Sequence, residues 1–138
     1  MSMSGAPTAQ VVEVRLVDGS IEIIKAYVAV DVGIALDPRN IEAQLHSALI
    51  FGLAAAKTGE ITVAEGRVEQ RNFNHYSIPR MHEIPEVETR IIESGEKIFG
   101  VGEAATPTIA PALGNAIFAA TGQRIRQLPF DKYISFAG

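Results

Sequence analysis

The residues from Phe99 to Pro107 carry the clearest chemical signal: they read Phe-Gly-Val-Gly-Glu-Ala-Ala-Thr-Pro. Glu103 is the only ionisable side chain between Ile98 and Gln123. A carboxyl group in such apolar surroundings is expected to have a raised pKa, which suits a general base. The alternative interpretation is that Glu103 caps the following segment or pairs with an arginine. The residue types alone leave both interpretations open.

Two glycines precede this glutamate and would let the backbone approach a ligand closely. The spacing Gly100-x-Gly102-x-x-Ala105 matches the dinucleotide-binding fingerprint in form. That fingerprint also needs a helix that opens inside it and an acidic residue about 20 positions later. We expect Pro107 and Pro111 to postpone the helix, and position 123 is Gln. We therefore reject dinucleotide binding of this type.

Other reaction classes find little support in the sequence. The histidines at positions 46, 75 and 82 do not form a metal-ligand pattern, and no G-x-S-x-G motif occurs, so we predict no protein-held metal and no serine triad. The absence of cysteine excludes thiolate zinc sites, iron–sulfur clusters and a cysteine nucleophile on this chain. A net charge of −4 argues against binding to nucleic acid or anionic lipid. Arg124 and Arg126 are expected to form a solvated or partner-facing edge.

The 138 residues predict a single domain, which we place at residues 10–138 after a flexible leader at residues 1–9. The leader has neither the basic nor the apolar region of a secretory signal. No apolar stretch approaches the about 20 residues that a membrane span requires, so no membrane span is expected. A cytoplasmic location is expected, with the periplasm as the second choice.

The pattern of apolar residues predicts the elements that must position Glu103. The alternation of apolar and charged residues near the start of the chain indicates a hairpin of two strands. Asp37 and Pro38 are typical of a helix start, and Gly52 within the helical stripe indicates close backbone packing. The predicted strands are 11–17, 21–32, 61–63, 67–70 and 87–93, the predicted helices run from 38 to about 58 and from 111 to 121, and 123–130 is a short strand or extended tail. This order predicts an α+β fold: a two-layer sandwich of a mixed sheet with two main helices on one face.

The run from Gly100 to Gly122 resembles the C-terminal signature of the molybdenum-binding subunit of the xanthine dehydrogenase/aldehyde oxidase family, most closely the isoquinoline 1-oxidoreductase β-subunit type. The resemblance covers nearly the whole chain from about Val11 onward. Further segments agree with the family in order and spacing: Val30-Asp31-Val32-Gly33 with Asp37-Pro38, Ala43-Gln44, Ile50-Phe51-Gly52-Leu53, Gly59-Glu60-Ile61-Thr62, and Asn72-Phe73 through Tyr76 to Arg80-Met81.

The resemblance implies a hydroxylase whose molybdenum is held by a molybdopterin, in bacteria usually the cytosine dinucleotide form. It implies that Glu103 is the catalytic base, that Gln44 hydrogen-bonds the pterin cofactor, and that Gly100, Val101 and Gly102 form the backbone beside the metal. The family often has Pro-Gly after the glutamate, where this chain has Ala104-Ala105. After Gln44 the family usually has an acidic residue and small residues, where this chain has Leu45-His46-Ser47-Ala48.

Family subunits are several times longer than this chain. The resemblance therefore implies the C-terminal, cofactor-binding portion of an enzyme that oxidises an aldehyde or an N-heterocycle, inactive until the remaining portion of the molybdenum subunit completes the pocket. Electrons would leave through a separate iron–sulfur subunit. The alternative is a non-catalytic α+β assembly or binding module that keeps the fold. Truncation would also expose apolar surface that normally faces the rest of the subunit, for example on the loop 99–111, and this predicts a homo-oligomer for the isolated chain.

Overall fold

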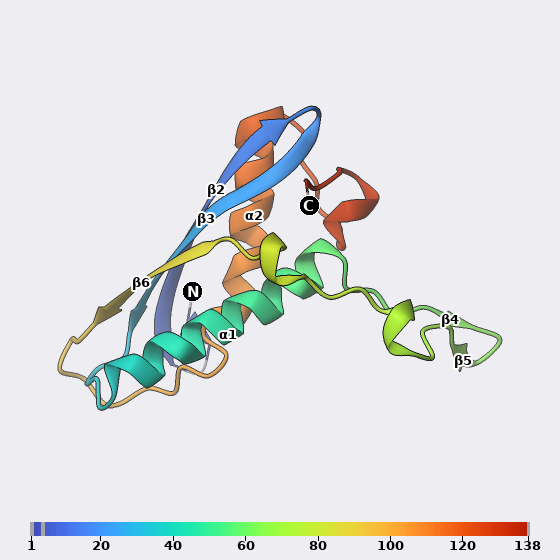
Figure 1. The fold of residues 1–138 in the computed structure, drawn as a ribbon. Coiled ribbons are helices and arrows are strands. Elements are labelled where there is room, and N and C mark those ends of the chain that lie inside the picture. Colours follow the sequence, from blue (N-terminus) through green and yellow to red (C-terminus); the bar gives the residue numbers. More distant parts are fainter. Residues whose placement is uncertain (1, 4, 138) are drawn as a thin grey trace.

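The computed structural model describes residues 2–3 and 5–137 and is built on one mixed sheet (Figure 1). The strand order is β1-β2-β3-β6, with antiparallel pairing of β1 to β2 and of β2 to β3, and parallel pairing of β3 to β6. The strands span Ser2–Met3 (β1), Ala6–Val17 (β2), Ser20–Asp31 (β3) and Glu86–Ile92 (β6). The predicted hairpin of strands 11–17 and 21–32 and the predicted strand 87–93 are confirmed.

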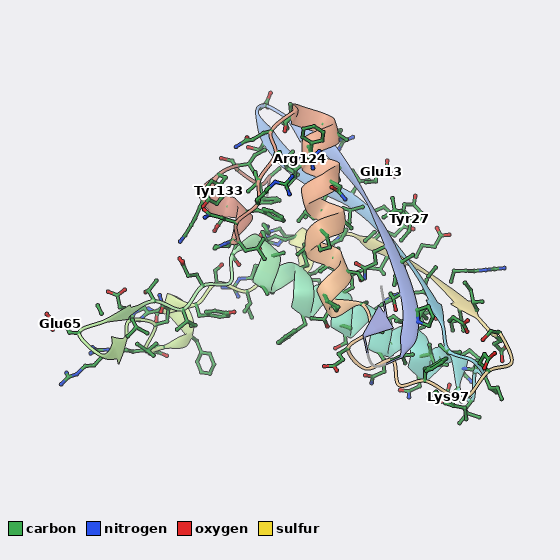
Figure 2. The ribbon with its side chains drawn as sticks, turned by 180° about the vertical axis from the view of Figure 1, so that it is seen from behind. Glu13, Tyr27, Glu65, Lys97, Arg124 and Tyr133 are labelled. Carbon is green, nitrogen blue, oxygen red and sulfur yellow. The ribbon has the colours of Figure 1, made fainter. Side chains whose placement is uncertain are left out.

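Two helices, α1 (Pro38–Lys57) and α2 (Thr106–Thr121), lie on the same side of this sheet (Figures 1 and 2). One side of β3 presents Ala26, Val28 and Val30 to them, all nearly or fully buried. The two-layer α+β arrangement predicted from the pattern is therefore confirmed. A sheet with only one face covered needs apolar residues at every second position, and β3 has them.

The long helix α1 forms as its sequence predicts. Asp37 has extended backbone and accepts a hydrogen bond from the Asn40 N–H at 3.1 Å, which caps the helix. The buried face repeats at helical spacing. Its members are Ile41, Leu45, Ala48, Leu49, Gly52, Leu53 and Ala56. Gly52 lies against α2: a Cβ there would stand 2.3 Å from the Thr106 carbonyl oxygen, so the predicted close backbone packing is confirmed.

The second helix begins five residues earlier than predicted, at Thr106 instead of Pro111. Pro107 occupies the first turn, where the missing N–H has no helical partner to lose. Pro111 lies inside the helix and removes one hydrogen bond there. Ile109 and Leu113, two residues before and two residues after this proline, are buried in the core, so tertiary packing outweighs the local penalty.

The structure also refines the predictions for the two terminal segments. Strand β2 begins at Ala6, so residues 6–9, which the sequence pattern assigned to a flexible leader, belong to the sheet; positions 1 and 4 of that leader lie outside the described residues. Ala6 is fully buried, and its small side chain is a core residue rather than a sign of disorder. Of the two alternatives predicted for 123–130, the strand is wrong: the segment runs without a strand into a short 3-10 helix, Phe130–Lys132. Phe136 then makes an isolated bridge to Ile21.

An arm projects from the body between α1 and β6 (Figure 1). We call residues 60–81 the hairpin arm. It carries the two-stranded sheet of β4 (Val63–Ala64) and β5 (Arg67–Val68), shorter than predicted, and the 3-10 turn Phe73–His75. A further 3-10 turn, Met81–Glu83, joins the arm to the body.

The base of the arm is held by a nearly buried ion pair between the Lys57 ammonium and the Glu83 carboxylate. Lys57 first, and then the Arg80 N–H, lower the pKa of the Glu83 carboxyl below its ordinary value of 4.5. Because the folded-state pKa is the lower one, the pair stabilises the fold above about pH 4.5. That contribution is lost as the pH falls through the folded-state pKa.

We expect Glu83→Gln to lower the free energy of unfolding at pH 7 by roughly 1 kcal/mol, because it leaves the Lys57 ammonium without its counter-charge. Urea unfolding between pH 3 and 8 should show this difference shrinking below pH 4.5. The matched control is Glu60→Gln, which breaks the exposed pair with Lys132 and should change stability little. Equal losses for both variants, or a loss that does not depend on pH, would contradict this role.

Candidate functional site

Gln44 and residues 100–102, which we call the glycine segment, line the same pocket, although they lie far apart in the sequence. Gln44, on the second turn of α1, lines a pocket of about 300 Å³ together with Gly100, Val101 and Gly102. A Cβ on Gly102 would stand 3.4 Å from the Gln44 side-chain oxygen, so the amide faces the bare backbone. The four predicted cofactor-binding residues therefore lie at one place.

The end of β3 holds the glycine segment in position. Phe99 N–H donates to the Val32 carbonyl at 3.2 Å, and Gly95 N–H donates to the Gly33 carbonyl at 3.0 Å. Gly33 has φ +73°, and a Cβ there would stand 2.1 Å from the Lys97 carbonyl oxygen. Only glycine adopts this positive φ without strain and also leaves room for the Lys97 carbonyl. A glycine at position 33 is therefore required for the loop to close against the sheet.

Asp31, the last residue of β3, organises the same loop. Its carboxylate accepts hydrogen bonds from Gly33 N–H at 2.9 Å, from Ser94 N–H at 3.3 Å and from the Ser94 hydroxyl at 3.0 Å. The pKa of Asp31 is lowered, first by the Gly33 N–H and then by Ser94. Asp31 is therefore an ionised structural acceptor.

Glu103 stands in the turn between the glycine segment and α2. Ala104 N–H donates to the Val101 carbonyl at 3.3 Å, and Thr106 N–H donates to the Glu103 carbonyl at 3.0 Å. Ala104 and Ala105 are buried, and the Ala105 carbonyl also accepts from the Gln10 amide at 3.0 Å. The backbone at Glu103 is thus anchored on both sides.

The side chain of Glu103 is exposed in this chain. The dry environment expected from its apolar sequence neighbours is therefore wrong for the chain by itself. Those neighbours, Ala104 and Ala105, are buried in the core, whereas Glu103 itself is exposed. Burial of this carboxylate would need another polypeptide over the turn.

The pocket has two polar members that sequence reasoning did not assign to it. Asn40 lies one helical turn before Gln44, and Asp37 lies at the helix start. A polar residue four positions before Gln44 was the available signal, because residues at i and i+4 share a helix face. Apolar side chains complete the wall: Val32, Ile34, Leu36, Ile41, Ile98 and Phe99. In the described part of the chain, no group of three or more His, Cys, Asp or Glu side chains could hold a metal ion.

The chain is similar to proteins that carry or bind molybdenum cofactors. The molybdopterin cofactor-binding domain family matches residues 2–85. Isoquinoline 1-oxidoreductase subunit beta of Brevundimonas diminuta is 34% identical over 128 residues, which is 91% of this chain and 16% of that protein. The molybdenum-binding subunit of an aldehyde oxidoreductase of Escherichia coli is 29% identical over 126 residues, which is 86% of this chain and 17% of that protein.

A solved structure of a molybdenum-containing protein is also similar to this chain. The Cu,Mo-CO dehydrogenase superposes with a TM-score of 0.70 at 28% identity, covering 80% of this chain and 15% of that one. The chain thus spans less than a fifth of the length of these relatives. In the described residues, no helix is both long and apolar enough to cross a membrane. By the family match over more than half of its length, the chain belongs to the molybdopterin cofactor-binding domain family.

Proposed function

We propose that this chain is the C-terminal, cofactor-binding portion of a molybdenum hydroxylase that oxidises an aldehyde or an N-heterocycle. The observation that carries the proposal is the meeting of Gln44 with Gly100–Gly102 at one pocket, with Glu103 next along the chain. The names of the relatives, an isoquinoline oxidoreductase and an aldehyde oxidoreductase, support this reaction class. We further propose the cytosine dinucleotide form of molybdopterin and electron transfer to a separate iron–sulfur subunit.

The residues at the pocket suit a polar heterocycle such as the pterin. Within the described residues the Gln44 side chain has no hydrogen-bond partner, so its amide can both donate and accept. A Cβ at Gly100 would meet nothing within 4 Å, which leaves the backbone there open to a ligand. A pocket of about 300 Å³ is at the small end for a cofactor-sized ligand, so we infer that further protein completes it.

In this proposal each residue has one task. Gln44 orients the pterin, the glycine backbone permits close approach, and the Glu103 carboxylate accepts a proton. The bound cofactor supplies the two-electron redox chemistry. The buried Ala104 and Ala105 anchor the backbone next to Glu103, directly after the glycine residues that line the pocket.

The proposal is tested by expressing the chain with its genomic neighbours and measuring molybdenum in the purified complex. A complex with stoichiometric molybdenum and with aldehyde or heterocycle oxidation supports it. A metal-free chain that forms no complex supports the alternative, a non-catalytic α+β assembly or binding module.

The hairpin arm is the surface that we propose the remaining portion of the molybdenum subunit covers. Phe73 and Met81 are 96% and 93% exposed, and Ile61, Val63 and Ile78 are also exposed. The sequence pattern assigned this role to the loop 99–111, where Phe99 and Val101 are half-buried instead. Apolar side chains that project in this way favour association with another protein surface.

For the isolated chain we expect a homo-oligomer whose association depends on the arm. The double variant Phe73→Ser, Met81→Ser should shift light-scattering mass toward the monomer, because it removes the two most exposed apolar side chains of the arm. The matched control is Phe51→Ser, which removes an exposed aromatic ring from α1. A wild-type chain that stays monomeric at high concentration, or equal effects of both variants, would refute the role of the arm.

A further inference from the structure

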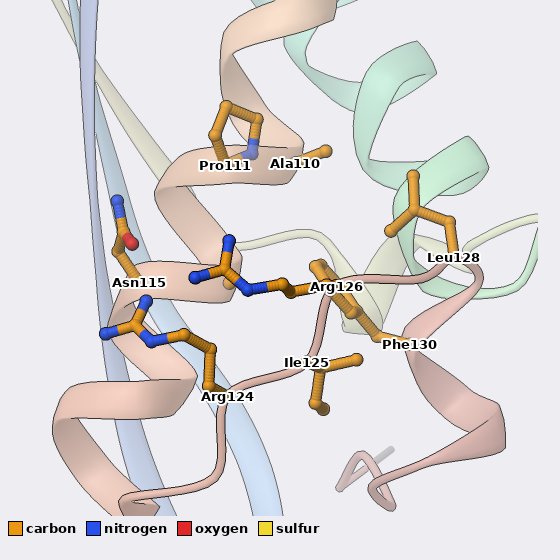
Figure 3. A pocket seen from close by; sticks show the side chains of 9 residues that line it. Ala110, Pro111, Asn115, Arg124, Ile125, Arg126, Leu128 and Phe130 are labelled. Atoms are coloured by element: carbon orange, nitrogen blue, oxygen red, sulfur yellow. The ribbon is translucent and has the colours of Figure 1, made fainter.

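A second pocket, of about 280 Å³, lies between α2 and the segment that follows it. It shares no lining residue with the pocket at Gln44. Figure 3 shows Arg124 and Arg126 reaching from the C-terminal segment across α2 toward Asn115. The molybdopterin proposal gives none of these side chains a task.

The charged side chains that line this pocket are all positive. Arg124 and Arg126 are exposed and neither forms an ion pair within the described residues, in a protein whose net charge is −4. Two guanidinium groups that converge without a carboxylate attract an anion, and each can bind a carboxylate through two parallel hydrogen bonds. The Asn115 amide adds a neutral hydrogen-bonding group beside them.

The pocket is also pre-formed. The Arg124 guanidinium stacks on the Phe118 ring at 3.6 Å from its centroid, which restrains its orientation before any ligand arrives. The Phe130 ring is buried at the floor, and a Cβ on Gly114 would stand 3.2 Å from it. A larger residue at position 114 would therefore crowd the ring or fill the pocket.

The rim combines this charge with apolar surface. Leu128 is 49% exposed and lines the same pocket as the two arginines. A small inorganic anion would use the guanidinium groups and leave Leu128 in water. A polypeptide segment with carboxylates on either side of an aliphatic residue would satisfy both parts.

We propose that this pocket, formed by Arg124, Arg126, Asn115, Leu128 and Phe130, binds an acidic segment of a partner polypeptide. Two carboxylates of the segment pair with the two guanidinium groups, and an aliphatic side chain between them packs against Leu128 over the Phe130 floor. The inference stands apart from the cofactor pocket, because a chain that binds no molybdopterin would keep this surface.

The test uses the full chain and NMR titration with the peptide acetyl-Glu-Leu-Glu-amide as probe. We expect shifts of the Arg124 and Arg126 Nε–H signals and of the Leu128 methyl signals. Arg124→Gln and Arg126→Gln should each weaken binding about tenfold, and Arg126→Lys should weaken it less because the charge remains. The matched control is Arg67→Gln, an exposed arginine on the hairpin arm, which should leave binding within about twofold.

Circular dichroism shows that each variant is folded before binding is compared. The peptide acetyl-Gln-Leu-Gln-amide should bind at least about tenfold more weakly than the acidic probe. Equal binding of both peptides, or equal weakening by Arg67→Gln, would overturn the proposal. Inorganic phosphate that displaces the acidic peptide at similar concentration would show a small-anion site and would also overturn it.

Discussion

Replacing Glu103 by Gln should, on the proposed function, abolish nearly all substrate oxidation by the molybdenum-containing complex of this chain and leave the molybdenum content unchanged. The side chain is exposed in this chain and its backbone is anchored by the buried Ala104 and Ala105, so the variant should fold as the wild type does. Glutamine keeps the size of the side chain and cannot accept the proton. General-base catalysis is typically worth about 10²- to 10⁴-fold, and we expect kcat to fall by about 10³-fold.

Glu96→Gln is the matched control, because it neutralises another exposed carboxylate in the loop that leads to the glycine segment. It should keep full activity. Elemental analysis and steady-state kinetics on the same preparations separate loss of cofactor from loss of chemistry. If Glu103→Gln keeps its molybdenum and oxidises substrate at the wild-type rate, Glu103 is not the base. If the molybdenum is lost together with the activity, the residue serves in cofactor retention instead.

Gly52→Ala should destabilise the fold strongly, and much more than the same substitution at Gly114, the glycine inside α2. The added Cβ would stand 2.3 Å from the Thr106 carbonyl oxygen and 2.6 Å from the Ile109 side chain. The carbonyl belongs to the backbone of α2, so the two helices must separate. Thr106 also donates its hydroxyl to the Ala48 carbonyl at 3.1 Å, and this contact would lengthen. Overpacking of this kind outweighs the gain in helix propensity, and we expect a net loss of about 3 kcal/mol.

A loss of this size should lower the midpoint of thermal unfolding by roughly 10 °C for a chain of this length. Gly114→Ala is the matched control, since it lies inside α2 and its Cβ would approach only the Phe130 ring, at 3.2 Å. A ring can shift by a few tenths of an ångström at small cost, so this variant should stay within about 1 kcal/mol of the wild type. Equal midpoints for Gly52→Ala and the wild type would refute the close packing of α1 on α2.

Local pattern was a good guide wherever the chain repeats regularly. The stripe from Ile41 to Ala56 predicted the buried face of α1, and Asp37 predicted its start, because both depend on contacts within a few residues. The same local reasoning failed at α2. Proline at position 111 argued for a later start, whereas packing of Ile109 and Leu113 in the core carries the helix through it.

Small residues were the second source of error. Ala6 and its neighbours were set aside as a leader because they lack a strong apolar pattern, yet Ala6 is fully buried in the sheet. Ala104 and Ala105 suggested a dry setting for Glu103, and they are themselves the buried residues while the carboxylate is exposed. Composition near a residue therefore did not predict the direction in which its side chain points.

By itself the sequence determined the types of the main elements, the buried stripe of α1, and the family resemblance that singled out Gln44 and Gly100–Glu103. These depend on periodicity, capping and motif spacing, which are properties of short segments. Only the tertiary structure decided that Gln44 faces Gly102, that Glu103 is exposed, and that Arg124 and Arg126 converge on one pocket. These facts depend on how distant segments pack, and that packing is set by the whole core rather than by any local pattern.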